Sequence, residues 1–502
     1  MNGPAFPSQV ERFRTVVASR LGLQFDDAKT AWLADLLRRR LDVNGQRAEP
    51  YLARLHAEAS RAELGAIAQE LTVAETYFFR NIDQFHALRE HVVPERMQAS
   101  GGHRGLRILS AGCASGEEPY SIAMMLHDLP HDRSRELSIR AVDLNPAMVE
   151  KARQARYTSW ALRDTPPAMQ QRWFRPDGRE FVLDDKIRSA VKFEERNLND
   201  DDAELWQPSA YDLIFCRNVL MYFTPSRAQA AVVRIARALT PGGYLFLGHA
   251  ETLRGLSQAF HLRHTHGTFY YQCKDAAEQQ LAQAPADAPG EAGPVLAAAL
   301  EVSDSWIEAI GKAAERVRTL TDAQVSGGIV PAAAPRWHLG QALDLFQRER
   351  FGEALGLVHA LPAAAGRDPD VLLLRAVLLV HSGQLALAED ACHRLLGIDE
   401  LNAGAHYALA LCREGAGDSR GAIDRDQRAV YLDPTFAMPR MHLGLLARRS
   451  GDHGAAQREL GQAMVLLQRE DASRLLLFGG GFSREALLAL CRAELQACAD
   501  PA

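Results

Sequence analysis

The stretch "ETYFFR" at residues 75–80 places three aromatic side chains next to one arginine. A guanidinium offers two parallel N–H groups that match the two oxygens of a carboxylate, so Arg80 is a candidate for holding an acidic group. Phe78 and Phe79 are residues of the kind that anchor a segment in an apolar core. The stretch therefore combines a binding cation with the hydrophobic residues that would fix its position.

A second set of candidate residues follows two apolar, strand-like runs. "LRILSA" leads into "GCASGEEP", where Gly112 and Gly116 form a turn that lets the backbone approach a ligand closely. This turn does not have the G-x-G-x-x-G pattern of dinucleotide sites. The next run ends at Asp143, whose carboxylate would be placed to accept hydrogen bonds from ribose hydroxyls. The combination predicts an adenosine cofactor held without phosphate-binding machinery, and S-adenosylmethionine fits this description.

The elements that must position these residues alternate between strands and helices from residue 105 to 273. The expected strands are "LRILSA", "LSIRAVDL", "YDLIFCRNVL" and "GGYLFLGH", and the expected helices are "EPYSIAMMLHDL", "PAMVEKARQARY" and "PSRAQAAVVRIARAL". Strand, helix and strand in repetition predict a parallel sheet covered by helices on both faces, which is the doubly wound α/β class. Residues 8–97 before it show helical spacing, with an apolar stripe that begins at Trp32 and Leu33.

The C-terminal third repeats itself with a period of 34 residues. Three columns follow this period: Ala354, Ala388, Ala422 and Ala456; Gly383, Gly417 and Gly451; and Ala342, Ala376, Ala410 and Gly444. Small residues at a 34-residue period, where two helices cross closely, are the signature of tetratricopeptide repeats. Such repeats form an all-α superhelix whose concave face binds peptides or partner helices.

These patterns divide the 502 residues into five segments. The predicted segments are an N-terminal helical domain at 8–97, a sheet domain at 98–273, an Ala/Pro-rich linker at 274–335, the repeats at 336–470 and a C-terminal cap at 471–502. The cap contains a run of three glycines at 479–481 that breaks the period.

Composition excludes several classes of function. The net charge of −6 and the lack of an aromatic and basic groove disfavour nucleic acid as a partner. No apolar run reaches the ~18 residues of a membrane span, and the N-terminus does not resemble a secretion signal, so we expect a cytoplasmic protein without membrane insertion. The seven cysteines are scattered without a C-x-x-C pair, which predicts neither a disulfide framework nor a metal site.

The motifs "ETYFFR", "ASGEEPYSIAM", "AVDLNP", "RNL", "YDLIFCRNVLMYF" and "GGYLFLGHAE" occur in this order within residues 8–273. This set resembles the CheR family of chemotaxis-receptor glutamate methyltransferases. The resemblance implies a Rossmann-like domain with a small antiparallel β-subdomain, here at about 157–193. It also implies methyl transfer from S-adenosylmethionine to glutamates of a methyl-accepting chemoreceptor, with S-adenosylhomocysteine as product. Fusion to tetratricopeptide repeats is a known variation in this family.

The resemblance also implies site residues. The implied cofactor contacts are Thr76, Arg80, Glu118, Asp143, Asn197, Leu198, Cys216, Arg217 and the neighbouring Asn218. Our hypothesis for catalysis is that Arg80 and Tyr222 position the substrate carboxylate. One departure from the family pattern is Ala74, where the family often has an asparagine that would bond to the cofactor.

Substrate recognition is expected to depend on other segments. Family members that tether to a receptor's C-terminal pentapeptide resemble one another in a long, multi-glycine loop, whereas the turn "RPDGRE" contains only Gly178, so we predict pentapeptide-independent action. The repeats would then dock the receptor or a further signalling protein. Arg38, Arg39, Arg40 and Arg47 are candidates for facing acidic receptor helices. Two alternatives remain: a repeat-based adaptor with a degenerate enzyme domain, and a methyltransferase that acts on a small molecule.

Overall fold

The computed structural model describes residues 6–275 with gaps at 26, 59–60, 72–74, 102–104 and 129–136, then residues 278, 342, 345 and 348, and residues 350–499 with gaps at 362–364 and 481. The chain forms two compact units, Met1–Ala284 and Pro285–Ala502, which we describe separately. Ala74 and nearly all of the predicted linker lie outside the described residues.

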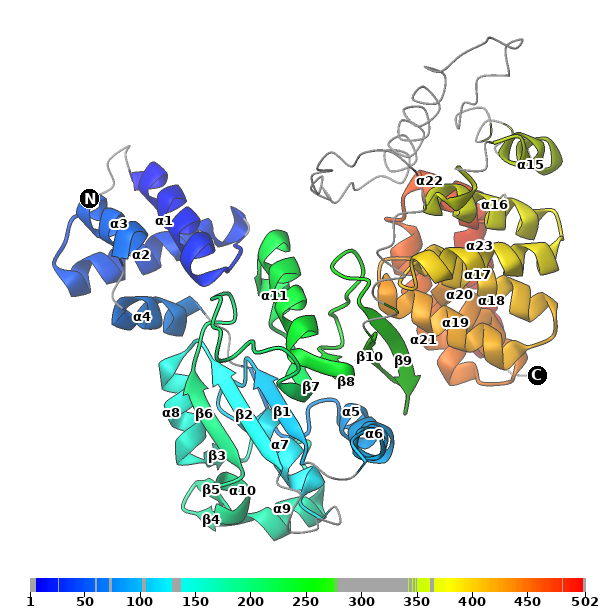
Figure 1. Ribbon diagram of the computed structural model, residues 1–502. Helices are drawn as coiled ribbons and strands as arrows, with labels where there is room; N and C mark the ends of the chain where they lie inside the picture. Colours follow the sequence, from blue (N-terminus) through cyan, green and yellow to red (C-terminus); the bar gives the residue numbers. More distant parts are fainter. Residues whose placement is uncertain are drawn as a thin grey trace, which may run out of the picture. The chain divides into compact units, whose positions relative to one another are not determined.

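The first unit begins with a group of helices (Figure 1). They are α1 (Phe6–Leu21), the short helix η1 (Asp27–Lys29), α2 (Thr30–Asn44), α3 (Ala48–Glu58) and α4 (Arg61–Leu71). On α2, Leu33, Leu36 and Leu37 are fully buried, as the predicted apolar stripe requires. Trp32 differs from that prediction, because it stays partly exposed and lines a cavity that is described below.

The arginine run on α2 is paired within the chain. Arg40 donates to both oxygens of Glu63 at 2.9 and 2.6 Å, and the side chains of both residues are largely buried. Arg39 bonds to Glu70 and Arg38 to Asp35. The expectation that the whole run faces a receptor is therefore wrong for Arg40, because its guanidinium holds α2 against α4.

The centre of the first unit is a seven-stranded sheet with the order β6-β2-β1-β7-β8-β10-β9. Its strands are β1 (Arg107–Ala111), β2 (Ser138–Asp143), β6 (Val191–Glu195), β7 (Tyr211–Cys216), β8 (Leu239–Leu247), β9 (Phe260–Thr265) and β10 (Thr268–Cys273). The first five are parallel to one another, which confirms the predicted α/β class. The antiparallel pairing of β10 with β8 and β9 was not part of the sequence prediction.

Helices pack on this sheet. They are α5 (Ile82–Ala87), the π-helix η2 (Leu88–Val92), α6 (Val93–Ala99), α7 (Glu117–Leu126), α8 (Pro146–Gln154), the short η3 (Leu220–Tyr222) and α11 (Pro225–Ala238). Helix α8 begins where it does because the Asn145 side chain accepts from the amides of Ala147 and Met148, and Pro146 takes the first helical position. Phe78 and Phe79 are 0% and 1% exposed within the core of this unit, so their predicted anchoring role is confirmed.

A small antiparallel sheet is inserted between β2 and β6 in the sequence. Its strands β3 (Arg156–Thr158), β4 (Phe174–Asp177) and β5 (Glu180–Leu183) pair in the order β3-β5-β4, with α9 (Pro167–Trp173) and α10 (Asp185–Arg188) beside them. Two residues, Gly178 and Arg179, connect β4 to β5, and Gly178 has the left-handed φ of 65° that such a tight turn requires.

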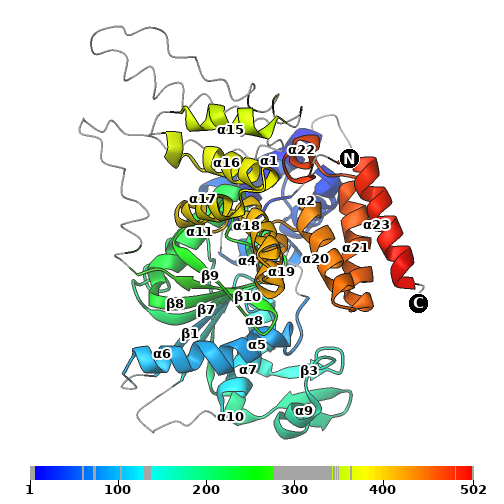
Figure 2. The ribbon, with the colours of Figure 1, turned by 90° about the vertical axis from the view of Figure 1, so that its right-hand side faces the viewer.

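The second unit is a stack of helix pairs (Figures 1 and 2). Its helices are α15 (Phe351–His359), the short η4 (Ala365–Arg367), α16 (Pro369–His381), α17 (Leu385–Ile398), α18 (Ala403–Gly415), α19 (Ser419–Leu432), α20 (Ala437–Arg449), α21 (His453–Leu467), α22 (Ala472–Phe478) and α23 (Arg484–Ala499). The 34-residue glycine column falls at the turn inside each pair, with φ between 71° and 82°. The alanine columns are fully buried where helices cross. The predicted tetratricopeptide-like helix pairs are therefore confirmed, with the small residues at the turns and at the helix crossings.

Two properties of the described residues bear on the sequence analysis. All seven cysteines are free thiols with buried side chains, as expected for small core residues. Within the part of the chain that the structure describes, no helix combines the length and the apolar character that crossing a bilayer requires.

Candidate active site

Two adjoining cavities lie at the carboxyl ends of the parallel strands. Their volumes are about 390 Å³ and about 190 Å³, and both are lined by Gly112, Ala114, Asn218 and Tyr222. Gly112 follows β1 and Asn218 follows β7, and these neighbouring strands are where the chain switches from one half of the sheet to the other. Open α/β sheets bind ligands at this switch point.

The larger cavity is mainly apolar. Its wall from the sheet domain includes Leu144, Met148 and Leu198, with the Asp143 carboxylate beside them. The N-terminal helical region supplies further lining residues, which are Leu23 and Phe25 from the connection after α1, Lys29, Trp32 and Leu71. A cavity of this kind suits a flat, apolar ring system with a polar group at the Asp143 end.

Asp143 is held by the backbone on both of its oxygens. Oδ2 accepts from the amide of Ala114 and Oδ1 from the amide of Asn145, each at 2.8 Å. Burial raises the pKa of Asp143, and the backbone hydrogen bonds oppose that rise. Each carboxylate oxygen can accept more than one hydrogen bond, so Asp143 is fixed in place and still has acceptor capacity toward the cavity.

The smaller cavity is polar. It is lined by Glu75, Thr76, Tyr77, Arg80, Glu118, Arg217 and Met221, in addition to the shared residues. Glu118 accepts from Ser110 Oγ at 2.8 Å and lies 3.4 Å from Arg217. Burial raises the pKa of Glu118, and the charge of Arg217 counteracts this effect. The cavity therefore presents both an acceptor and cations to whatever enters it.

Arg217 works largely inside the protein. Its Nη2 donates to the carbonyl oxygen of Arg80 at 2.5 Å and to Asn81 Oδ1 at 2.7 Å, and its side chain is only 3% exposed. Burial lowers the pKa of Arg217, and Glu118 opposes that change. Because it binds the backbone of Arg80 and the carboxylate of Glu118 together, Arg217 fixes the distance between the two segments that line the polar cavity.

The segment 75–81 is held by several contacts, which explains the unusual "ETYFFR" sequence. The amide of Phe78 donates to the carbonyl of Ala161 at 3.0 Å, and the amide of Phe79 donates to Ser121 Oγ at 2.9 Å. Arg163 lies over the ring of Tyr77, with Cζ 3.7 Å from the ring centroid. Arg80 donates to the carbonyl of Glu75 at 3.0 Å. The aromatic residues thus fix the loop, and Arg80 remains partly exposed at the cavity.

The loop after β7 depends on a single buried carboxylate, that of Glu251. Its Oε2 accepts from the amides of Asn218 and Gly248 at 2.6 and 2.8 Å, and its Oε1 accepts from the amides of Val219 and Met221 at 2.9 and 3.3 Å. Asn218 has a left-handed φ of 59°, which this bonding holds in place. Glu251 therefore sets the backbone that carries Asn218 and Tyr222 to both cavities.

We expect Glu251→Gln to lower the free energy of unfolding by about 1–3 kcal/mol, because an amide NH₂ would face backbone N–H donors and leave them unpaired. Urea denaturation measures this change. The exposed Glu150→Gln on α8 is the matched control and should leave stability unchanged. If the two variants unfold at the same urea concentration, Glu251 does not organise the loop.

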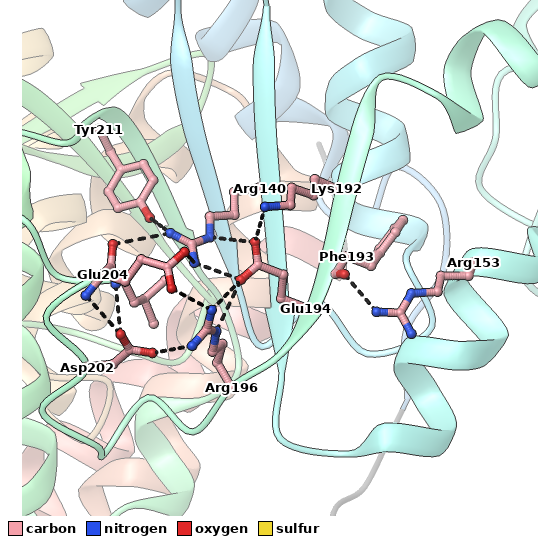
Figure 3. A network of polar contacts seen from close by, with 10 residues as sticks. Arg140, Arg153, Lys192, Phe193, Glu194, Arg196, Asp202, Glu204 and Tyr211 are labelled. Carbon is pink, nitrogen blue, oxygen red and sulfur yellow. Dashed lines mark hydrogen bonds and ion pairs between the residues drawn. The ribbon is translucent and has the colours of Figure 1, made fainter.

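The loop after β6 is fixed by a network of charges (Figure 3). Glu194 accepts from Arg140 on β2 and from Arg196 at the start of the loop, and Arg196 also pairs with Asp202 and Glu204. Burial alone would raise the pKa of Glu194, but hydrogen bonds from Arg140, Lys192 and Arg196 lower it to about 2. The loop that carries Asn197 and Leu198 to the larger cavity is thereby tied to the sheet.

Comparison with known proteins agrees with this geometry. Residues 74–269 match the family described as CheR methyltransferase, SAM binding domain. The chain is 36% identical over 266 residues to chemotaxis protein methyltransferase 2 of Vibrio cholerae, covering 52% of this chain and 91% of that relative. The chain belongs to the CheR methyltransferase family. It is accordingly an S-adenosylmethionine-dependent methyltransferase.

Two further relatives show how far the likeness extends. Chemotaxis protein methyltransferase Cher2 of Pseudomonas putida is 32% identical over 271 residues, covering 53% of this chain and 97% of that relative. The probable biofilm formation methyltransferase WspC of Pseudomonas aeruginosa is 29% identical over 449 residues, covering 89% of this chain and 96% of that relative. The match to WspC therefore extends beyond the CheR domain, into the C-terminal region.

The two cavities fit S-adenosylmethionine. Its adenine suits the apolar walls of the larger cavity, and its ribose diol suits the acceptor oxygens of Asp143. Its amino and carboxylate groups are of the right charge for Glu118 and the cations of the smaller cavity. The residues of the larger cavity thus match the adenosine part of S-adenosylmethionine, and those of the smaller cavity match its amino acid part.

The structure brings most of the predicted site residues together. Thr76, Arg80, Glu118, Asp143, Asn197, Leu198, Arg217, Asn218 and Tyr222 all line one or both cavities. Cys216 is fully buried at the end of β7 and does not belong to the described lining of either cavity. Its side chain is packed in the core, so any role of Cys216 would be through its backbone.

Sequence reasoning missed two kinds of residue. Lys29 and Trp32 line the larger cavity from more than 100 residues upstream of β2. The sequence assigned Trp32 to an apolar helix stripe, and nothing in the local pattern of Lys29 distinguishes it from a helix surface. Glu251 was visible in "GHAE" as part of the family motif, but its contacts to Asn218 and Val219 depend on how β8 lies beside β7.

Proposed function

We propose that this CheR family member methylates glutamate side chains on the cytoplasmic helices of a methyl-accepting chemoreceptor. The observation that carries the proposal is the meeting of the two cavities at Tyr222 and Asn218, with Asp143 in one and Arg80 in the other. The bound cofactor supplies a methyl group activated by a positively charged sulfur, and S-adenosylhomocysteine is the product. We also propose cofactor-binding roles for Thr76, Arg80, Glu118, Asp143, Asn197, Leu198, Arg217 and Asn218, which this arrangement supports.

The reaction does not require the protein to transfer a proton. A glutamate side chain has a reference pKa near ~4.3, so the substrate is already ionised at neutral pH and needs no general base. The negative carboxylate and the positive donor become two neutral groups, so charge disappears in the transition state and a site that excludes water favours it. The main contribution of the protein is then to align the carboxylate oxygen with the methyl group.

Arg80 and Tyr222 are the residues we propose for this alignment. Arg80 is partly exposed in the polar cavity and anchored through its carbonyl to Arg217. Tyr222 lines both cavities, and its carbonyl accepts from the amide of Gln24 at 2.7 Å. A guanidinium that gripped the nucleophile strongly would reduce its reactivity, so we propose that Arg80 orients the carboxylate rather than neutralising it.

Radiolabelled methyl transfer to receptor-containing membranes tests the proposed substrate. We expect label in the receptor band that mild alkali releases, since methyl esters hydrolyse under conditions that leave amide-linked methyl groups intact. Calorimetry with S-adenosylhomocysteine separates the alternatives. Binding without protein labelling would favour a small-molecule substrate, and the absence of binding would favour a repeat-based adaptor.

We also propose that methylation does not require a receptor pentapeptide tether, because the β4–β5 connection is a two-residue turn at Gly178 and Arg179. Removing the C-terminal pentapeptide from the receptor should therefore change the initial rate of methylation by less than about twofold. The intact receptor at the same concentration is the control. A tenfold loss of rate on truncation would contradict this proposal.

The repeats would instead supply docking to the receptor or to a further signalling protein in the cytoplasm. Such docking would raise the effective concentration of a weakly held substrate. Deletion of residues 336–502 should then lower receptor methylation in cells, while the isolated enzyme domain keeps its affinity for S-adenosylhomocysteine. Equal methylation with and without the repeats would count against this role.

A further inference from the structure

The segment between α21 and α23 is an insertion in the repeat pattern. Helix α18 packs against α17 and α20 against α19, and in the same way α23 packs against α21. Helix α23 therefore takes the place of the next first helix and caps the stack. The residues between them, 468–483, include α22 and are not needed to continue the superhelix.

This inserted segment crosses the first helices of three successive pairs. The carbonyl of Leu477 lies 3.1 Å from His381 Nε2 on α16. The ring of Phe478 lies 5.8 Å from that of Tyr407 on α18 and 5.1 Å from that of Phe436, which precedes α20. A Cβ built on Gly404 would lie 3.0 Å from Phe478 Cζ, so the glycine makes room for this ring.

The face that the segment covers is the inner one. Helices α16 and α18, the first helices of two successive pairs, pack directly against each other, and we take the face that the first helices line as the inner one. The concave face of such a superhelix is its usual binding surface. Leu475, Leu477 and Phe478 of α22 are each at most 7% exposed, and the ring of Phe478 packs against this face.

A charged contact sets the orientation of the segment. Arg474 pairs with Asp433 at 3.1 Å, and its Cζ lies 5.1 Å from the ring centroid of Phe436. Glu470 accepts from the amide of Ala437 at 2.7 Å, at the start of α20. The segment thus places Arg474 against Asp433 and Phe436. One helical turn later, Leu477 and Phe478 follow, and Phe478 contacts the aromatic rings of Tyr407 and Phe436.

We propose that the inner groove of the repeats is a peptide-binding site that the chain's own residues 470–480 occupy. Its partner is a helical segment with a basic residue followed one turn later by an aromatic residue, which displaces α22. The frame remains complete without α22, because α23 packs on α20 and α21. Gly479 and Gly480 follow the helix directly, and Gly480 has a φ of 65°. These two glycines provide a flexible hinge that allows α22 to move out of the groove.

The energetics favour a competitive arrangement. A tethered segment acts at an effective concentration on the order of mM. It therefore outcompetes ligands that bind the groove weakly and is displaced by a partner that binds the groove with higher affinity. Aromatic and arginine side chains at the centre of an interface carry most of its binding energy. Phe478 and Arg474 are therefore the residues whose removal should open the groove.

Fluorescence anisotropy with a labelled peptide of residues 470–483 tests this on the full-length chain. We expect Phe478→Ala and Arg474→Ala to bind the peptide at least tenfold more tightly than the wild type, because their own segment no longer competes. Phe482→Ala is the matched control, since Phe482 is 61% exposed and lies outside the contacts described. The same peptide with alanine in place of its phenylalanine should bind at least tenfold more weakly to the opened chains.

Hydrogen exchange of the wild type keeps the proposal testable if a substitution unfolds the repeats. The Gly479 amide, which donates to the carbonyl of Leu475 at 2.7 Å, should exchange at least 100-fold faster than amides in the middle of α18. Equal exchange rates, or equal peptide binding by the wild type and a folded Phe478→Ala chain, would overturn the proposal. These measurements involve no methyl donor, so they fail or succeed independently of the proposed function.

Discussion

Arg80→Ala should lower kcat/KM for receptor methylation by roughly 100-fold, which corresponds to about 2.7 kcal/mol of transition-state stabilisation. Arg80 lines the polar cavity but not the apolar one, so most of the cofactor surface does not touch it. A misaligned carboxylate reacts slowly even when it is bound, since the reaction depends on near-attack geometry. We therefore expect the larger part of the loss in kcat and a smaller loss in the affinity for S-adenosylhomocysteine, since Arg80 is also among the implied cofactor contacts.

Two variants sharpen this test. Arg80→Lys keeps the charge but loses the planar fork, so it should recover only part of the rate. Arg89→Ala removes an exposed arginine from the neighbouring η2 and should behave like the wild type. Initial rates at saturating cofactor measure all three. If Arg80→Ala methylates the receptor at the wild-type rate while its melting temperature is unchanged, Arg80 has no role in positioning the substrate.

Asp143→Asn should weaken S-adenosylhomocysteine binding by about 100-fold. The carboxylate is the acceptor we assign to the ribose hydroxyls, and hydrogen bonds to charged groups contribute about 1.5–3 kcal/mol each. The amide also turns one of the two oxygens into a donor, which would face the backbone N–H of Ala114 or Asn145. Titration calorimetry measures the affinity directly, without a protein substrate.

The control for Asp143 must separate binding from folding. Glu150→Gln removes a carboxylate from the exposed side of α8, the helix that follows Asp143 in the sequence, and should leave the dissociation constant unchanged. The ligand-free melting temperature of Asp143→Asn shows whether the loop after β1 persists. A folded Asp143→Asn chain that binds S-adenosylhomocysteine as tightly as the wild type would remove Asp143 from the cofactor site.

Asp143→Asn and Arg80→Ala should affect different measured quantities. Loss at Asp143 should appear in the cofactor dissociation constant, and the larger part of the loss at Arg80 in the rate of the chemical step. This separation follows from the position of each residue in its own cavity, with Tyr222 and Asn218 shared between them. A variant at Tyr222 would affect both measurements, which is why Arg80 and Asp143 are the more informative pair.

The parallel strands, the helices between them and the 34-residue repeats were all predictable from the sequence. These features are local: an apolar run such as that of β7 is buried along its whole length, and small residues such as Ala388 and Ala422 recur where helices must cross closely. The position of Asp143 at a strand end was also predictable, because parallel strands bring their carboxyl ends to one edge. Asn218 was implied only by the resemblance to the CheR family.

Which distant residues complete the site, and which face of the repeats is covered, depends on how the elements pack in three dimensions. Trp32 lines the larger cavity together with residues at the strand ends, although it is far from them in the sequence. Glu251 organises a loop about 30 residues earlier in the sequence because β8 runs beside β7. The sequence showed that the glycines after α22 interrupt the repeat. It did not predict that Phe478 would pack into the inner groove. Such contacts depend on how separate elements pack, and the periodicity of each element constrains only its own buried face.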